Sequence, residues 1–361
     1  MRFFFGLALL LCVVAAARIP VFFDQDSLAG GSNVLSLAMA LLHPGIEVVG
    51  IGVIAGDSSI DDAVFATLQV VEACGKHVPV ARGAGDPFLN SREDMYGRIA
   101  LYGPKGGDGW LGEWRANDPP RGAVPRGSVR RVPGLPDPTI KEEPIHAAEL
   151  LVRLAREYDG RLVLVTAGPL TNVALAVHLA PDIVQRIAAV FTMAGALHVR
   201  SKFNFWWDAE SAAVFLRQNW KEKTLITIDV SEKTRFTTDL LQKALPDSNP
   251  KVLAWLKAQF SQPWTEMNLP MWDELTVAAL VDAVETKEEA LHVGVDFTWG
   301  PSYGATLFWN ASRADNGGGF VPHWAHRLRP WRVVTDIDVP RFERLFCDTM
   351  RQTLGHGKAD L

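Results

Sequence analysis

Cysteine is scarce in this sequence, with three among 361 residues, so a disulfide-dense fold is excluded. There is no Lys/Arg-rich stripe either: 36 basic residues are outweighed by 41 acidic ones, which gives a net charge of -5 and no electrostatic footprint for nucleic acid. Hydrophobic residues make up 48% of the chain, too many for a disordered or collagen-like protein. A globular protein of ordinary polarity remains.

Long apolar runs are also missing, except at the start of the chain. Residues 1–17 carry one basic residue, an apolar run over Phe3–Val14 and three alanines ending at Ala17. The run is shorter than the ~20 residues that span a bilayer, which favours a signal peptide over a membrane anchor. We therefore expect cleavage after Ala17, a mature chain over residues 18–361, no membrane attachment, and secretion or residence in an endomembrane lumen.

Export would allow a disulfide bond and an N-linked glycan in the mature chain. Cys12 leaves with the signal peptide, so the mature chain keeps Cys74 and Cys347 and at most one disulfide. The sequon Asn310-Ala311-Ser312 becomes a candidate glycan site in an exported glycoprotein.

Strand-like and helix-like segments alternate along the mature chain. The strand-like runs are 19–23, 46–54 and 161–166, and the helix-like runs are 34–42, 61–74 and 171–179, with Gly75 as a C-cap. This alternation predicts an α/β fold with a mostly parallel central sheet and helices on both faces. A length of about 150 residues per domain allows two domains, but we expect one, because α/β domains commonly exceed 250 residues.

Acidic and glycine residues recur where the predicted strands end. These positions are Asp24 and Asp26, Gly56-Asp57, Ala167-Gly168, Ala194-Gly195 and Asp229. Each one alone is explained as an ordinary turn or helix cap. Together they predict a site, because parallel sheets bind ligands at the carboxyl ends of their strands.

Residues 96–144 differ in composition from the rest of the chain, because they are rich in glycine, proline and arginine. We interpret them as a long, irregular excursion over the mouth of the site, since long loops in compact domains are usually functional or disordered. The arginines at 126, 130 and 131 are explained as a solvated surface.

Several common chemistries lack their motifs. There is no G-x-S-x-G elbow, no P-loop, no dinucleotide fingerprint and no zinc-type Cys/His spacing.

Other motifs, taken together, resemble one known family. They are Asp24-Gln25-Asp26, Ile54-Ala55-Gly56-Asp57, Val78-Pro79-Val80-Ala81-Arg82-Gly83, Gly107-Asp108-Gly109, Gly168-Pro169-Leu170-Thr171-Asn172, Phe203-Asn204 and Trp272-Asp273-Glu274-Leu275-Thr276. Their order and spacing are similar to those of the inosine/uridine-preferring nucleoside hydrolases over nearly the whole mature chain. The resemblance implies the nucleoside hydrolase fold, a small-molecule nucleoside substrate and hydrolysis of its N-glycosidic bond. It also implies a possible homo-oligomer.

The same resemblance implies a Ca²⁺ site, at which an aspartate takes a proton from the attacking water. Asp26 matches the catalytic base and first metal ligand. The Ala167 carbonyl and Asp273 match further metal ligands. Calcium binds six to eight oxygens, so each ligand matters.

The resemblance also implies which residues contact the substrate, because they stand at the matching positions of this sequence. Asp24 matches a supporting strand-end carboxylate, Asn204 a ribose-contacting asparagine, and Asp57 a position that is acidic in purine-preferring members. Trp272 resembles the purine-specific branch, and we expect it to contact a base, with Trp110 or Trp114 on the second face. His146 and His198 are interpreted as structural or solvated.

Three positions depart from the family pattern. Where the family has two aspartates after the first strand, a gap-free register gives Gly30 and Gly31, and a longer loop gives Ser32 and Asn33, whose amide oxygen would be a weaker metal ligand. Lys202 stands where the family has an acid that meets the ribose.

Two outcomes therefore stay open. In one, the enzyme holds a looser divalent ion, or Lys202 supplies positive charge in its place. In the other, the chain is a catalytically impaired nucleoside- or sugar-binding relative.

Overall fold

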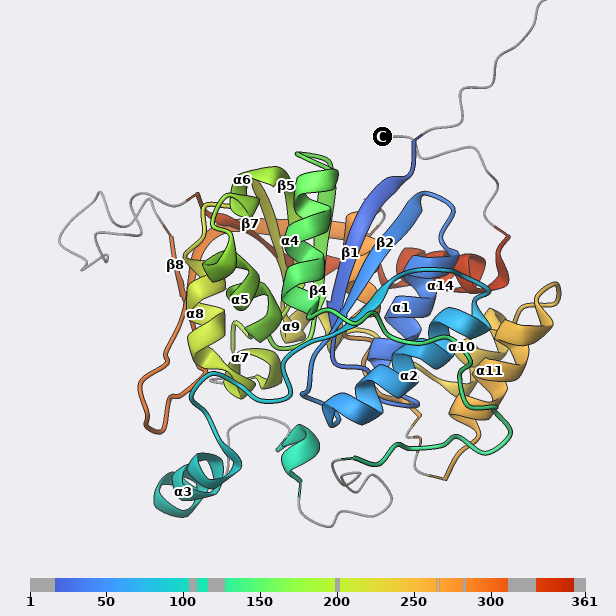
Figure 1. Ribbon diagram of the computed structural model, residues 1–361, viewed down its shortest axis with the longest axis horizontal. Coiled ribbons are helices and arrows are strands. Elements are labelled where there is room, and N and C mark those ends of the chain that lie inside the picture. Colours follow the sequence, from blue (N-terminus) through green and yellow to red (C-terminus); the bar gives the residue numbers. More distant parts are fainter. Residues whose placement is uncertain are drawn as a thin grey trace, which may run out of the picture.

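The structure is a computed structural model, and it describes residues 17–103, 109–115, 127–198, 202–263, 265, 267–281, 284–310 and 329–353 (Figure 1). Several features of the sequence lie outside these residues. They are almost all of the proposed signal peptide 1–17, Gly107 and Asp108, Trp264, and the last two residues of the sequon at 310–312.

A nine-stranded sheet forms the centre of the described chain, in the order β3-β2-β1-β4-β5-β6-β9-β7-β8. The strands are β1 (Ile19–Gln25), β2 (Ile46–Val53), β3 (Val80–Arg82), β4 (Leu162–Ala167), β5 (Ile187–Met193), β6 (Glu222–Ile226), β7 (Glu285–Val295), β8 (Thr306–Trp309) and β9 (Trp331–Ile337). All neighbours from β3 to β9 pair in parallel, and β7 and β8 add an antiparallel edge. The predicted α/β fold with a mostly parallel sheet is confirmed.

Helices cover both faces of this sheet (Figure 1). The first face carries α1 (Ser32–Leu42), α2 (Ile60–Ala73), α10 (Thr238–Ala244), α11 (Pro250–Phe260), α12 (Glu274–Leu280) and α14 (Val339–Arg351). The second carries α4 (Ala147–Glu157), α5 (Thr171–Leu179), α6 (Ile183–Arg186), α7 (Phe203–Trp207) and α8 (Ala209–Leu216). The short α9 (Ile228–Ser231) follows β6. Each face has its own apolar core, so the sheet is buried on both sides.

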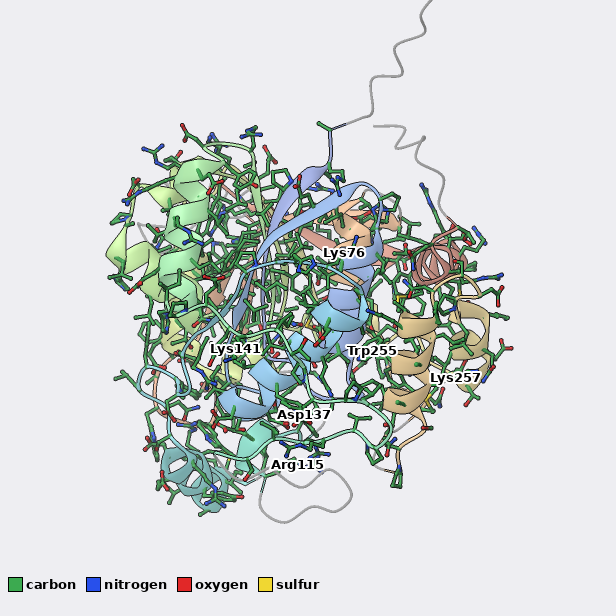
Figure 2. All side chains as sticks on the ribbon, turned by 45° about the vertical axis from the view of Figure 1, so that its right-hand side comes forward. Lys76, Arg115, Asp137, Lys141, Trp255 and Lys257 are labelled. Atoms are coloured by element: carbon green, nitrogen blue, oxygen red, sulfur yellow. The ribbon has the colours of Figure 1, made fainter. Side chains whose placement is uncertain are left out.

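The buried position of α1 follows from its sequence. It contains no charged residue, and ten of its eleven residues are buried. A helix that is apolar all round is stable only when it is enclosed, and α1 packs against α2, α12 and α14. Further out, Trp255 of α11 lies in the same core, while Lys257 on that helix faces the solvent (Figure 2).

Within the sequence range 96–144, the described part is less irregular than predicted. Residues 96–102 complete α3 (Arg92–Tyr102), which begins with a Ser91 N-cap, and Gly112–Trp114 form a 3₁₀ turn, η1. We missed α3 because it is weakly amphipathic and only two of its residues are buried. The rest of the described range, from residue 127 on, is irregular chain with turns, bends and one bridge between Ala81 and Glu143.

Cys74 and Cys347 are both free thiols, so the disulfide that the sequence allowed does not form.

Gly75 has a φ of +66°, as its predicted role after the end of α2 requires. Among the described residues, no helix combines the length and apolarity needed to cross a bilayer.

Asn172, in the first turn of α5, ties three segments together. Its side-chain nitrogen donates to Asp24 Oδ1 at 2.9 Å and to the Val53 carbonyl at 3.2 Å, and its oxygen accepts from the Ala84 N–H at 2.8 Å. The motif that carries it, Gly168 to Asn172, therefore positions the strand ends around Asp24.

Replacing Asn172 with alanine should destabilise the fold. The change leaves Asp24 Oδ1 and the Ala84 N–H without these partners, while the Val53 carbonyl still accepts from the Gly83 N–H. A stranded buried polar group costs about 1–3 kcal/mol, so we expect a loss of about 2 kcal/mol or more in the free energy of unfolding. Urea denaturation measures it. The exposed amide of Asn219 gives the matched control, because Asn219→Ala should leave the midpoint almost unchanged, and equal effects of the two variants would contradict the role of Asn172.

Candidate active site

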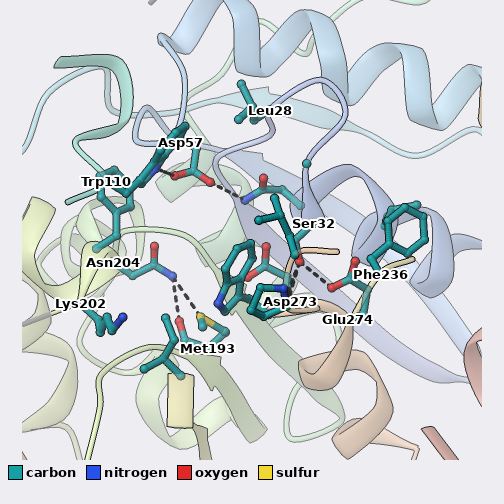
Figure 3. A pocket seen from close by; sticks show the side chains of 18 of the residues that line it. Leu28, Ser32, Asp57, Trp110, Met193, Lys202, Asn204, Phe236, Asp273 and Glu274 are labelled. Atoms are coloured by element: carbon teal, nitrogen blue, oxygen red, sulfur yellow. Dashed lines mark hydrogen bonds between the residues drawn. The ribbon is translucent and has the colours of Figure 1, made fainter. Parts of the chain in front are cut away.

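A cavity of about 490 Å³ opens at the carboxyl ends of the parallel strands (Figure 3). Its polar walls come from the first turn of α1, the turn after β2, the start of α7 and the start of α12. The polar and aromatic side chains used below are Ser32, Asn33, Asp57, Trp110, Arg115, Lys202, Asn204, Glu232, Trp272, Asp273 and Glu274. The position agrees with the general rule for ligand sites in open parallel sheets.

Asp26 lies directly behind this cavity, just after β1. Its carboxylate fits between two glycine turns: a Cβ on Gly56 would come within 2.3 Å of Oδ2, and one on Gly168 within 2.9 Å of Oδ1. Oδ2 accepts a hydrogen bond from the Asp57 N–H at 2.8 Å, and Oδ1 accepts one from the Asn33 amide at 3.0 Å. Asp26 is buried and is not among the residues that line the cavity.

Burial dominates the electrostatics of these acids. It raises the pKa of Asp26 well above its ordinary value, and the neighbouring charges of Asp57 and Asp273 add to the shift. Burial also raises the pKa of Asp273, with Glu274 and Asp57 as further causes. The pKa of Asp24 rises to about 7 through burial, partly opposed by the bond from Asn172. The site thus concentrates acidic groups that resist ionisation.

The start of α1 contains the residues of both registers that the sequence left open. The helix begins at Ser32, and Ser32 and Asn33 both line the cavity from its first turn. Gly30 adopts a φ of +71° in the preceding turn and Gly31 is the N-cap, so neither occupies a helical position. Of the four candidate residues, Ser32 and Asn33 are therefore the two that bring polar side chains to the cavity from the first turn of α1.

Ser32 joins the starts of α1 and α12. Its hydroxyl donates to Glu274 Oε2 at 2.5 Å and accepts from the N–H groups of Trp272 at 3.2 Å and Asp273 at 3.0 Å (Figure 3). These residues are about 240 positions away in the sequence. One hydroxyl thus fixes both acids of the Trp272–Glu274 segment beside the cavity.

Glu274 is a site residue that the sequence reasoning did not select. Its side chain is fully buried, and Oε1 has no hydrogen-bond partner. Burial raises its pKa to about 8, against a smaller lowering effect of the Ser32 bond. Its place directly after Asp273 in the Trp272–Thr276 motif was the available signal.

Replacing Glu274 with glutamine should stabilise the protein increasingly as the pH rises. The folded carboxyl keeps its proton up to about pH 8, whereas the unfolded one loses it near its ordinary value of 4.5. Wild-type stability therefore falls between these values, and Glu274→Gln, which keeps an acceptor for Ser32, escapes that loss. Thermal unfolding at pH 5 and pH 8 should show the advantage of the variant only at the higher pH.

The exposed Glu157 offers a control for this measurement, since Glu157→Gln should behave like wild type at both pH values. A Glu274→Gln variant that is no more stable than wild type at pH 8 would contradict the raised pKa.

Trp110 and Trp114 have different roles. The Trp110 indole lines the cavity, donates to Asp57 Oδ1 at 2.5 Å, and carries the Arg115 guanidinium 4.6 Å from its ring centre (Figure 3). Trp114 is buried and stacks on Trp207 with 3.9 Å between ring centres. The expectation that Trp114 could form the second aromatic face of the site is therefore wrong, because it belongs to the core.

The opposite wall brings Lys202, Asn204 and Trp272 together. Lys202 is buried, and its Nζ lies 3.8 Å from Glu232 Oε1. The Asn204 amide nitrogen donates to the Met193 carbonyl at 2.9 Å, so its oxygen is the end that points away from Met193 (Figure 3). Trp272 packs on Met193 and Ile228.

Three other strand-end positions do not reach the cavity. Asp24 is buried behind Asp26 and is held by Asn172, and Ala167 is buried at the end of β4. Asp229 instead accepts hydrogen bonds from the N–H groups of Leu197 and His198. Asp24 and Asp229 thus have structural partners that explain their positions.

Metal binding can be tested on this donor set. Both Asp26 oxygens already accept hydrogen bonds, and the Asn33 nitrogen, not its oxygen, faces the carboxylates. In the described part of the chain, no three His, Cys, Asp or Glu side chains are grouped so that they could hold a metal ion. Calcium needs six to eight oxygen ligands, and Asn33 presents its nitrogen to the carboxylates, so these side chains do not fit a resident Ca²⁺.

The fold and the cavity define an α/β protein with a polar cavity, large enough for a small molecule, at the carboxyl edge of its sheet. Residues 21–344 match the family described as inosine-uridine preferring nucleoside hydrolase. The chain belongs to this family, whose members are metal-dependent nucleoside N-ribohydrolases, and the resemblance seen in the sequence is confirmed.

Individual relatives are distant. The pyrimidine-specific ribonucleoside hydrolase RihB of Escherichia coli (strain SE11) is 24% identical over 303 residues, covering 80% of this chain and 86% of the relative. The solved purine-preferring ribonucleoside hydrolase from Gardnerella vaginalis has a TM-score of 0.67 at 22% identity, and the alignment covers 92% and 98% of the two chains. An inosine-guanosine nucleoside hydrolase has a TM-score of 0.70 at 19% identity, with the same coverage.

Proposed function

We propose that this protein hydrolyses the N-glycosidic bond of purine ribonucleosides, releasing ribose and the free base. The observation that carries the proposal is the pairing of acids with aromatic side chains: Asp273 and Glu274 line the cavity with Asp26 directly behind it, and Trp110 and Trp272 line the same cavity. Family membership supplies the reaction type. The carboxylates suit a cationic sugar transition state, and the aromatic rings suit a flat base.

The proposed reaction balances with water alone. Water adds its oxygen to the anomeric carbon, and the bond from that carbon to the base nitrogen breaks with its electron pair going to the base. One proton of the water passes to a carboxylate, and the base takes up a proton from the solvent on a ring nitrogen. The carboxylate then returns its proton to the solvent, so that water alone is consumed. The oxocarbenium-like sugar in between is stabilised by negative charge nearby.

Asp26 is our proposed base for the water. Burial raises its pKa, so that Asp26, in the fraction of molecules in which it is ionised, is a stronger base than an exposed aspartate. Because Asn33 occupies Oδ1 on the cavity side, the water would exchange with this amide at Oδ1, while the Asp57 N–H keeps Oδ2 in place. No step of the proposal runs through a metal ion.

Replacing Asp26 with asparagine tests this role. Removing a general base costs about 100-fold or more, so release of hypoxanthine from inosine should fall at least that far while the far-UV circular dichroism stays unchanged. Asp229→Asn is the matched control, since that carboxylate follows β6 at the same edge without lining the cavity. Unchanged turnover in Asp26→Asn would move the base to another residue.

We further propose a preference for purines, for which Trp272 is the main support. Its indole borders the cavity beside the ribose-side residues Asn204 and Lys202. A larger base offers more surface to stack on an indole, and stacking contributes about 1–3 kcal/mol per base. The relatives named above include both pyrimidine-specific and purine-preferring enzymes, so the walls of the cavity, rather than the fold, decide the preference.

Trp272→Ala should therefore lower kcat/KM for inosine by about tenfold or more and affect uridine less. Trp299 lies outside the cavity, so Trp299→Ala controls for the loss of an indole. Equal kcat/KM values for inosine and uridine in the wild type would contradict the purine assignment.

A second candidate is a nucleoside- or sugar-binding protein with little turnover. The observation in its favour is that Asp26 is separated from the cavity by Asn33. Calorimetric binding of inosine without any release of ribose would support this candidate over the hydrolase.

On sequence grounds alone, we propose that the protein is exported after loss of residues 1–17 and that Asn310 carries a glycan. Self-association is likewise a proposal, which rests on the family resemblance.

A further inference from the structure

The Asn33 amide occupies an unusual place between two carboxylates. Its nitrogen lies 3.0 Å from Asp26 Oδ1 and 3.4 Å from Asp57 Oδ2, so its two hydrogens are directed at two different acids. Asn33 and Asp26 are buried, whereas Asp57 is partly exposed where it lines the cavity. An amide oxygen in this place would face two acceptors, so the nitrogen is the end that fits.

Ser32, the residue before Asn33, also donates a hydrogen to a carboxylate. Ser32 gives its hydroxyl hydrogen to Glu274 and accepts from two backbone N–H groups. In the longer-loop register, these two residues replace two aspartates of the resembling family. Both positions therefore donate hydrogens to carboxylates, where aspartates would offer oxygens to a cation.

Lys202 extends this change in charge to the opposite wall. Its buried ammonium lines the same cavity, in the place of an acidic residue of the resembling family. Compared with that pattern, the site loses three negative charges and gains a positive one. Because calcium affinity depends strongly on the number of charged ligands, such a site attracts a divalent cation far less.

We infer that the Asn33 amide, helped by Lys202, stands in for a resident divalent cation and holds Asp26 and Asp57 together by hydrogen bonds. The site then binds Ca²⁺ only with a dissociation constant above about 1 mM, weaker than extracellular calcium modules. This inference concerns the site of the proposed function but does not need the reaction to occur, because ion binding is measured without substrate.

The test is calorimetric titration of the full mature chain, stripped with EDTA, with CaCl₂. We compare wild type, Asn33→Asp and Asn219→Asp, which adds the same charge at an exposed position. Wild type and Asn219→Asp should give no saturable binding, whereas Asn33→Asp should bind one Ca²⁺ at least about tenfold more tightly than wild type.

Thermal unfolding in 5 mM CaCl₂ and in EDTA gives a second readout. The midpoint of Asn33→Asp should rise in calcium, since an ion that binds only the folded state stabilises it, and the wild-type midpoint should not move.

Two results would overturn the inference. The first is stoichiometric binding by wild type with a dissociation constant below about 1 mM, a result that does not require any variant to fold. The second is a folded Asn33→Asp with no gain in affinity. Absence of base release from inosine would count against the proposed function alone and would leave this inference intact.

Discussion

The structure depends on keeping several carboxylates buried together at one edge of a parallel sheet. Asp24, Asp26, Asp273 and Glu274 are all buried there, and burial raises the pKa of each. Buried acids are tolerated only when other groups donate hydrogens to them or when they keep a proton. Asn172, Asn33, Ser32 and the Asp57 N–H are the donors present, and each comes from a different turn than the acid it serves.

This requirement links the site to the fold. Ser32 connects α1 to α12, and Asn172 connects α5 to β1 and β2, so the hydrogen bonds that orient the acids also fasten helices from both faces to the strand ends. A change in one donor therefore alters stability and site geometry together. The two effects separate only when stability and turnover are measured on the same variant.

The cavity has chemically different sides. Acids and amides gather near α1 and α12, while Trp110 and Trp272 provide flat apolar surface and Lys202 adds a positive charge. A sugar with a leaving base needs such a division, with polar groups for the hydroxyls and rings for the base. The fold is shared with distant hydrolases of differing preference, so the fold alone does not set the substrate preference.

The sequence by itself determined the alternation of strands and helices, the family, and the clustering of acids at strand ends, because these depend on local periodicity and on motifs read in order. The tertiary structure alone decided that α1 begins at Ser32 and that the Asn33 nitrogen faces Asp26. It also decided that Glu274 joins the site and that Trp114 belongs to the core. Loop length and side-chain orientation are set by contacts between residues as far apart as Ser32 and Glu274. No local pattern encodes such contacts.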